Sequence, residues 1–484
     1  MNADVRRIAV DPPGDTIFTR IFRIHGPSAC IRAHTLTPVI DRIGSRLSAV
    51  HADHKRILRS AMLVSFFVLV GKSAGAMKEM AIAYRYGISA AVDAYQLTLT
   101  MITWVPGTVA TVLGVVLVPT LVRLQKLPER ERTLFLGELQ GASLVLGILL
   151  AGTLYGAWDA VLAVMDAHLP YRTAELSREM ARGMSFISFF TLLICVSGAR
   201  LQARDRHVNT LLECIPAGVL LVWIWLTPNK NTYVPLTWGT TAGFLLQAAC
   251  VSVLAARADG IRPGLRFGFR SSQWPAMYRA LGVFMVGQMV MSLVTPLDQY
   301  FVANLGSGAI ATLGYANRLL GLLMSMGALA IGRATLPVFA DILSSADPDR
   351  ACTTAFKWAA VMFVGGCLVA IVGWLGAPQG VRLMFQRGAF GAQDTLAVSA
   401  LVGWGLIQLP FYFAVLVLVQ CFASEGRFRA MAAIAMINFG VKALGDYVLV
   451  GWMGIAGILL ASALMHASSL GCYLVLSRKV AKCR

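Results

Sequence analysis

Charged side chains gather in the first long apolar stretch of the chain. Lys72, Lys78 and Glu79 lie within it, and Asp93 follows at the start of the next stretch. A charge at the depth of a bilayer costs at least about 2.5 kcal/mol on insertion scales, so such residues are candidates for function. Lys72 and Glu79 are seven positions apart and share a helix face. Gly75 lies between them and has no side chain, so another helix can approach this face closely. The structural alternative is that Lys78 and Glu79 pair with neighbouring helices while Lys72 reaches toward the membrane surface.

The second half of the chain carries a matching set of charges. Asp298, Arg318 and Arg333 lie in two apolar stretches there. Cations from both halves facing one cleft suit a phosphate or pyrophosphate, because arginine makes forked contacts and lysine supplies a point charge. Asp298 and Arg333 are candidates for the cavity or for packing, and a helix end at the cytoplasmic surface is the alternative for Arg333. Lys442 and Asp446, four residues apart, are typical of a structural pair on one helix.

The elements that must hold these charges are membrane-spanning helices. Of the 484 residues, 57% are hydrophobic and only 14% are charged, which excludes an ordinary soluble globular protein. Apolar runs of about 20 residues recur along the chain, and a helix satisfies its own backbone hydrogen bonds in hydrocarbon. We therefore expect an all-α integral membrane protein with about twelve transmembrane helices. The predicted spans are 58–86, 91–122, 135–165, 182–203, 208–227, 235–256, 277–304, 309–340, 352–376, 393–421, 428–449 and 453–477.

Membrane topology explains the net charge of +18, because Lys and Arg collect in alternate loops between the predicted spans. By the positive-inside rule these loops and both termini are cytoplasmic, in a multi-pass protein of the cytoplasmic membrane. The same pattern removes the reason to expect a nucleic-acid partner. The nine cysteines form no Cys-x-x-Cys pair, so neither a metal site nor a disulfide framework is indicated.

The basic segment 257–275 divides the chain into two halves of six spans each. We expect a cytoplasmic N-terminal extension at 1–56, an N-terminal half at 57–256 and a C-terminal half at 276–484. A glycine, a tyrosine and a proline recur at similar distances, within one residue, in the first hairpin of each half, namely Gly87, Tyr95 and Pro119 against Gly306, Tyr315 and Pro337. An even number of spans per repeat predicts parallel repeats, that is, two six-helix bundles with a central cavity between them.

Several short segments together make the chain similar to a known family. They are Gly71–Glu79, Val92–Tyr95, Leu297–Tyr300, Gly314–Leu319, Leu336–Pro337, Phe385–Phe390 and Gly454–Gly457. In this order and spacing the chain resembles the MviN/MurJ family of lipid-linked glycan flippases, within the multidrug/oligosaccharidyl-lipid/polysaccharide exporter (MOP) superfamily. The resemblance implies the MOP-type fold. It also implies a flippase that moves a polyprenyl-pyrophosphate-linked glycan, such as a lipid II-like peptidoglycan precursor, across the bacterial inner membrane.

The resemblance also implies which residues bind the pyrophosphate headgroup. In the family, basic residues of the first span, an acid opening the second and an arginine of the eighth line the cavity, and they match Lys72, Lys78, Asp93 and Arg318 here. The family's basic pair farther along the second span falls in 102–109, which holds no charge. Members dedicated to peptidoglycan also have two further C-terminal spans beyond the twelve counted here. A flippase for exopolysaccharide or O-antigen-type lipid-linked units is therefore the alternative.

Two other functional classes fit less well. A multidrug or cation antiporter of the same superfamily would place acids at the centre of its cavity. A membrane enzyme of glycan synthesis would need carboxylates or histidines in a large loop outside the membrane. We therefore expect no catalytic residues, no cofactor and no metal. The mechanism we expect is alternating access driven by the membrane potential or by a coupled cation, with the lipid-linked oligosaccharide and the membrane lipids as partners.

Overall fold

The structure is a computed structural model, and the chain divides into two compact units, residues 1–63 and residues 64–484. The described residues are 52–165, 169–204, 208–228, 232–260, 264–344 and 348–482. Side chains are described from residue 66 onward, except at 280, 283, 284, 286, 329, 330, 332–352 and 478–482. The predicted extension 1–56 lies outside the described residues up to position 51, and the first described helix already begins at Ala52.

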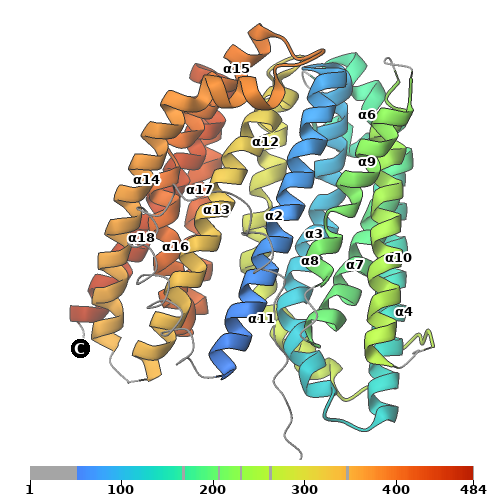
Figure 1. Ribbon diagram of the computed structural model, residues 1–484, viewed down its shortest axis with the longest axis vertical. Helices are drawn as coiled ribbons and strands as arrows, with labels where there is room; N and C mark the ends of the chain where they lie inside the picture. Colours follow the sequence, from blue (N-terminus) through green and yellow to red (C-terminus); the bar gives the residue numbers. More distant parts are fainter. Residues whose placement is uncertain are drawn as a thin grey trace, which may run out of the picture. The chain divides into compact units, whose positions relative to one another are not determined.

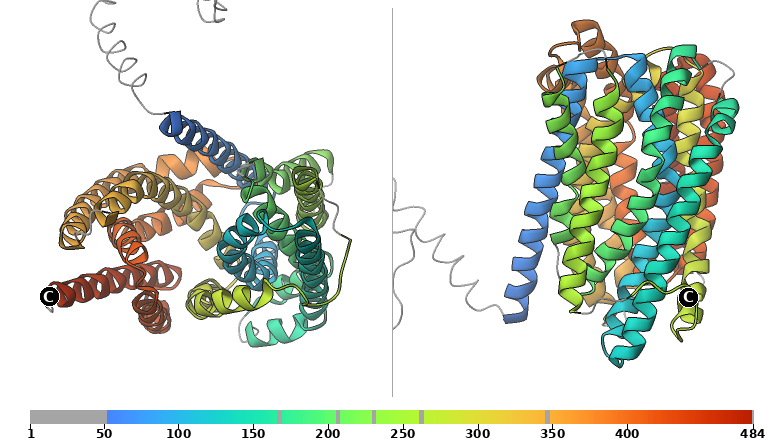
Figure 2. Two further views of the ribbon diagram at one scale, coloured as in Figure 1. Left: turned by 90° about the horizontal axis from the view of Figure 1, so that it is seen from below. Right: turned by 90° about the vertical axis from the view of Figure 1, so that its right-hand side faces the viewer.

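Helices account for almost all of the described chain, and in residues 64–484 they run roughly parallel to one another (Figure 2). The first half contains α2 (Ala52–Tyr86), α3 (Ala90–Leu124), α4 (Glu129–Gly156), α5 (Trp158–Met165), α6 (Tyr171–Met184), α7 (Phe186–Gln202), α8 (Val208–Leu212), α9 (Ile215–Leu226), the π-helix η2 (Pro235–Gly239) and α10 (Thr240–Asp259). The second half contains α11 (Trp274–Ser292), α12 (Val294–Ala303), α13 (Ala309–Ser344), α14 (Pro348–Phe385), α15 (Ala392–Leu406), α16 (Leu409–Ser424), α17 (Phe428–Met453) and α18 (Ile455–Lys482).

The apolar composition of these helices fits a membrane fold. Seven helices in the described chain are long and apolar enough to cross a membrane, or nine if each of two bent helix pairs is one span. Each of the twelve predicted spans falls mostly in helix, and the described residues contain no β-strand. The predicted all-α membrane fold is confirmed, whereas the number twelve stays a prediction.

The two halves repeat one packing pattern (Figure 1). In the first half α7 contacts α3, α4 and α10, and α10 also contacts α9. In the second half α16 contacts α13, α14 and α18 in the same way, and α18 also contacts α17. The bent pairs hold equivalent places, since α6 meets α7 at 44° and α15 meets α16 at 43°. This repetition supports the repeat that the sequence predicts.

Helix α3 joins the two halves, because it contacts α11, α12 and α13 as well as α6 and α7. In its first turn, Asp93 is 1% exposed and accepts hydrogen bonds from the backbone N–H groups of Gly308 (2.6 Å) and Ala311 (2.7 Å). These N–H groups lie at the start of α13 and have no partner within their own helix, so a carboxylate of one half caps a helix of the other. At the same junction Tyr315 donates to the carbonyl oxygen of Gly87 over 3.0 Å.

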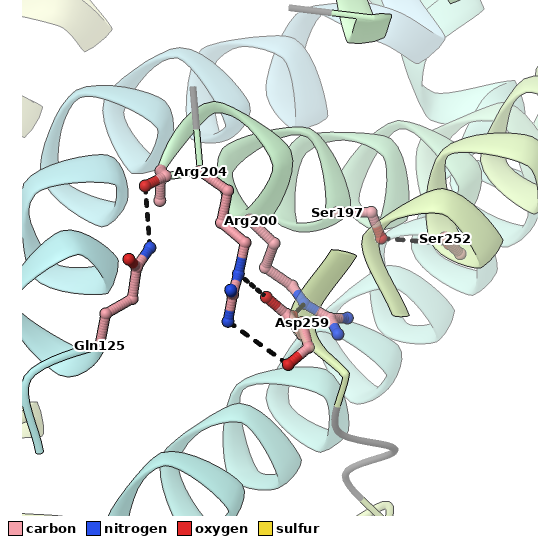
Figure 3. A network of polar contacts seen from close by, with 7 residues as sticks. Gln125, Ser197, Arg200, Arg204, Ser252 and Asp259 are labelled. Carbon is pink, nitrogen blue, oxygen red and sulfur yellow. Dashed lines mark hydrogen bonds and ion pairs between the residues drawn. The ribbon is translucent and has the colours of Figure 1, made fainter. Parts of the chain in front are cut away.

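A buried ion network links α7 to α10 close to the C-terminus of α3 (Figure 3). The carboxylate of Asp259 accepts hydrogen bonds from Nε of Arg200 (2.7 Å) and Nε of Arg204 (2.8 Å). Nearby, Gln125 donates to the carbonyl oxygen of Ala203 over 2.8 Å. One carboxylate thus pairs two guanidinium groups, which gives the network an excess of positive charge. The positive-inside rule predicts that this end is cytoplasmic.

We predict that Asp93→Ala lowers the free energy of unfolding by about 2 kcal/mol, because two buried N–H groups of α13 lose their acceptor. Thermal unfolding of the purified protein in detergent measures the loss. Asp394→Ala is the matched control, since Asp394 accepts a hydrogen bond from the N–H of Gly391 (2.8 Å) at an exposed helix start. The control variant should lose about 1 kcal/mol or less. Equal losses in the two variants would contradict a role for Asp93 in joining the halves.

Candidate functional site

Two adjoining cavities lie between the halves. The smaller, of about 350 Å³, is lined mainly by α2, α13 and the break between α8 and α9. The larger, of about 730 Å³, extends along α3. Gly75, Lys78, Glu213 and Arg318 line both of them. Since α2 belongs to one half and α13 to the other, these cavities form the central cavity that the repeat predicts.

A buried carboxylate connects cations from the two halves in the smaller cavity. Glu79 Oε1 lies 2.8 Å from Nζ of Lys78 on α2 and 3.0 Å from Nε of Arg318 on α13. Glu79 is only 5% exposed, whereas the side chain of Arg318 is 49% exposed. A single carboxylate cannot occupy all the donors of a lysine and an arginine. Both cations therefore keep N–H groups for an anion that enters the cavity.

Lys72 lines the same cavity and interacts electrostatically with Glu213. Glu213 lies at the break between α8 and α9, where the chain leaves regular helix. Sequence reasoning did not single out this residue. The signal was nevertheless present, because Glu213 is the one charged residue in the predicted span 208–227.

The charges that line the two cavities favour an anion. Lys72, Lys78 and Arg318 face two carboxylates, those of Glu79 and Glu213, so the described lining carries one more positive than negative charge. In a medium of low dielectric constant such an excess attracts anions strongly. The planar guanidinium of Arg318 matches the spacing of phosphate oxygens, and the two ammonium groups add point charges.

The wall of the larger cavity along α3 offers hydroxyl groups. Thr103, Thr108 and Thr111 line it, and each donates to the backbone carbonyl four residues earlier, at 2.6, 2.8 and 2.9 Å. Their oxygen lone pairs therefore remain available as acceptors. Trp104 lies in the same wall and donates from Nε1 to Oγ of Ser292 (3.1 Å). Acceptors beside an aromatic ring suit a ligand that is rich in hydroxyl groups.

Three of the predicted residues lie elsewhere or are not described. Asp93 lines neither cavity, because its carboxylate caps α13. Asp298 Oδ1 lies 2.6 Å from Nζ of Lys442 inside the second half, and Lys442 also contacts Asp446 at 2.7 Å, which confirms the predicted pair four residues apart. Arg333 is in α13, and its side chain lies outside the described residues. The cavity thus gathers Lys72, Lys78 and Arg318, the cations predicted for the headgroup, together with Glu79, but not the predicted acid Asp93.

Comparison with known proteins gives consistent sequence matches. The family described as "Lipid II flippase MurJ" matches residues 82–483. The chain is 23% identical over 444 residues to a probable lipid II flippase MurJ of Bdellovibrio bacteriovorus, covering 87% of this chain and 82% of that protein. It is 26% identical over 453 residues to a probable lipid II flippase MurJ of Synechocystis sp., covering 87% and 81%.

Solved structures share the fold. A lipid II flippase MurJ in an inward closed conformation matches with a TM-score of 0.72 at 18% identity, covering 86% of this chain and 87% of that one. An inward-facing multidrug resistance MATE family transporter of the MOP superfamily matches with a TM-score of 0.65 at 15% identity, covering 84% and 97%. At these identities the structural likeness establishes the fold alone.

We predict that Glu79→Gln lowers the free energy of unfolding by about 3 kcal/mol, because it leaves Lys78, whose side chain is 15% exposed, without its carboxylate. The double variant with Lys78→Met should recover most of this loss, and thermal unfolding of the three variants gives the coupling energy. Glu175→Gln is the control, since the exposed pair of Glu175 with Arg172 (3.1 Å) contributes about 1 kcal/mol or less. If the losses of unfolding free energy in Glu79→Gln and Lys78→Met simply add up in the double variant, the pairing is contradicted.

Proposed function

Because the chain belongs to the MurJ family of lipid II flippases, we propose that it carries lipid II across the bacterial cytoplasmic membrane. Lipid II is the polyprenyl-pyrophosphate-linked precursor of peptidoglycan, and its headgroup moves from the cytoplasmic to the outer side. Both termini of the chain lie in the cytoplasm. The observation that carries the proposal is the cluster of cations around Glu79, because a pyrophosphate is the part of this substrate that needs them.

The two adjoining cavities suit the two polar parts of the substrate. Lys72, Lys78 and Arg318 hold the pyrophosphate in the smaller cavity, which lies between the halves. The glycan occupies the larger cavity, where the threonine hydroxyls of α3 accept hydrogen bonds from its hydroxyl groups. The polyprenyl tail stays in the bilayer throughout. The lack of a basic pair in α3 is therefore compatible with this substrate, since the cations needed for the pyrophosphate come from α2 and α13.

Binding competes with an existing contact between the halves. The carboxylate of Glu79 occupies donors of Lys78 on α2 and of Arg318 on α13 in the structure. An incoming pyrophosphate offers more oxygens and more negative charge to the same donors, so it displaces Glu79 from Arg318. The substrate then becomes the link between the halves, and its binding energy acts on their relative position.

Alternating access requires that the junction at the start of α3 opens. Asp93 releases the first turn of α13, and Ala389 releases the carbonyl oxygen of Tyr84, to which its N–H donates over 2.8 Å. The membrane potential favours this outward step for an anion by about 2.3 kcal/mol per charge per 100 mV. The antiporter alternative is disfavoured, because both carboxylates of the cavity already face cations.

We predict that Arg318→Ala and Lys72→Ala weaken lipid II binding by about 30-fold each, because each removes a charged donor to the pyrophosphate, worth about 2 kcal/mol. Binding is measured on protein in detergent, and flipping on proteoliposomes with fluorescent lipid II. Arg318→Lys should lose less affinity for lipid II, since lysine keeps the positive charge but cannot make the forked hydrogen bonds of a guanidinium group. Arg172→Ala, which removes an exposed cation of α6, is the control and should behave as wild type. Unchanged binding in both alanine variants would overturn the headgroup site.

We also predict that Glu79→Gln binds lipid II about tenfold more tightly than wild type, because the pyrophosphate no longer displaces a carboxylate from Arg318. Flipping should nevertheless slow, since the empty carrier loses the contact that restores its starting state. Glu79→Asp keeps the negative charge and should retain an affinity near that of wild type. Weaker binding in Glu79→Gln would contradict the competition.

A further inference from the structure

Glu213 is a carboxylate of the central cavities that the headgroup site does not use. It lies between α8 and α9 and lines both cavities. Pro216, Ala217 and Leu220, which follow it on α9, also line the larger cavity, and their side chains are apolar. Glu213 is therefore the polar group of this part of the wall, and it lies where the pyrophosphate cavity and the glycan cavity adjoin.

The carboxylate of Glu213 has no close partner. It interacts electrostatically with Lys72, but it forms neither an ion pair nor a hydrogen bond with any other part of the chain that the structure describes. Glu79 differs in this respect, because it lies within 3.0 Å of two cations. Glu213 is also exposed, whereas Glu79 is buried. The acceptor oxygens of Glu213 are therefore available to a ligand.

Binding of a pyrophosphate changes the charge around Glu213. The described lining of the cavities carries one more positive than negative charge, and a doubly charged pyrophosphate turns this excess into a deficit. The pyrophosphate also takes Lys72, the cation that acts on Glu213, as its own partner. A carboxylate without a counter-charge is unfavourable in a medium of low dielectric constant. A ligand that brings a positive group to Glu213 is therefore favoured.

An ammonium group suits this position better than a metal ion. Hard metal ions take about six oxygen ligands, and Glu213 supplies a single carboxylate beside the repelling charge of Lys72. An ammonium group needs fewer acceptors, and one carboxylate gives it a charge-assisted hydrogen bond. The break between α8 and α9 offers a further acceptor. Because Pro216 has no N–H, the carbonyl oxygen of Leu212, four residues earlier, loses its usual helical donor.

We propose that Glu213 binds an ammonium group of the substrate while the pyrophosphate lies on Lys72, Lys78 and Arg318. This inference rests on the proposed flippase function and deepens it, because it makes the preferred substrate a lipid-linked glycan with a free amine. Lipid II meets this requirement, since the sugar bonded to its pyrophosphate carries a peptide with a side-chain amine. A lipid-linked polysaccharide unit without amines lacks this contact, so Glu213 favours the peptidoglycan precursor over such a unit.

Acetylation of the side-chain amine of lipid II tests the contact. Binding of lipid II and of acetylated lipid II is measured on the full-length protein in detergent. Acetylation should weaken binding to wild type about tenfold, because the resulting amide has no positive charge for Glu213. In Glu213→Gln, acetylation should change the affinity less than about twofold. Glu79→Gln is the matched control, since two cations already occupy the carboxylate of Glu79, and acetylation should still weaken binding about tenfold.

Acetylated lipid II also separates a specific contact from a general effect of charge. Glu213→Gln removes a negative charge near the pyrophosphate, so it should tighten the binding of acetylated lipid II. The same variant should weaken the binding of lipid II itself, because the ammonium group loses its partner. Glu213→Asp is the second variant if Glu213→Gln does not fold, and it should keep part of the preference for the free amine.

Three results would overturn the proposal and leave the flippase function standing. The first is equal affinity of wild type for lipid II and for acetylated lipid II. The second is a Glu213→Gln variant that still prefers the free amine. The third is binding that depends on sodium ions in wild type but not in Glu213→Gln, which would assign the carboxylate to an inorganic cation. A complete absence of lipid II binding and flipping in wild type would instead refute the proposed function.

Discussion

A charge at bilayer depth must have a partner, and the carboxylate of Glu79 meets this constraint for both halves at once. It pairs Lys78 from α2 with Arg318 from α13, and so it permits two cations to remain in an apolar bundle while no substrate is present. The cavity depends on this arrangement, because unpaired cations would either destabilise the fold or recruit adventitious anions. The same arrangement makes the site responsive, since an anion stronger than one carboxylate can take its place. In the proposed function, the stabilising contact and the binding site are therefore the same group of atoms.

The junction between the halves follows a related rule in the backbone. The first turn of a helix leaves N–H groups without partners, and in α13 Asp93 of the other half supplies the acceptor. Such a cap is strong when buried, yet it consists of a few hydrogen bonds that a small displacement breaks together. This property suits a contact that must hold one conformation firmly and then release it.

The sequence predicted the helical membrane fold, the repeat and the cations of the cavity, because apolar runs and intramembrane charges carry strong signals. It assigned Asp93 to the headgroup on family resemblance, and in the structure its partners lie 215 and 218 residues away along the chain. No local sequence pattern predicts a contact between residues so far apart in the chain. Glu213 was overlooked because it is isolated in its span, and its proximity to Lys72 depends on how α8 and α9 pack against α2. The pair of Lys442 with Asp446 was predictable from helical spacing, whereas the contact of Lys442 with Asp298 of α12 was not.

The two charge clusters obey the same constraint with opposite signs. Around Glu79, two cations share one carboxylate, and in the proposed function the anionic substrate supplies the missing negative charge. Around Lys442, the two carboxylates of Asp298 and Asp446 share one ammonium. The cluster around Glu79 lies between the halves, whereas the cluster around Lys442 lies within the second half. In both places an unbalanced charge is unfavourable, because the surrounding medium has a low dielectric constant. Because α12 and α13 contact each other and α3, a change in packing at one cluster reaches the helices that hold the other.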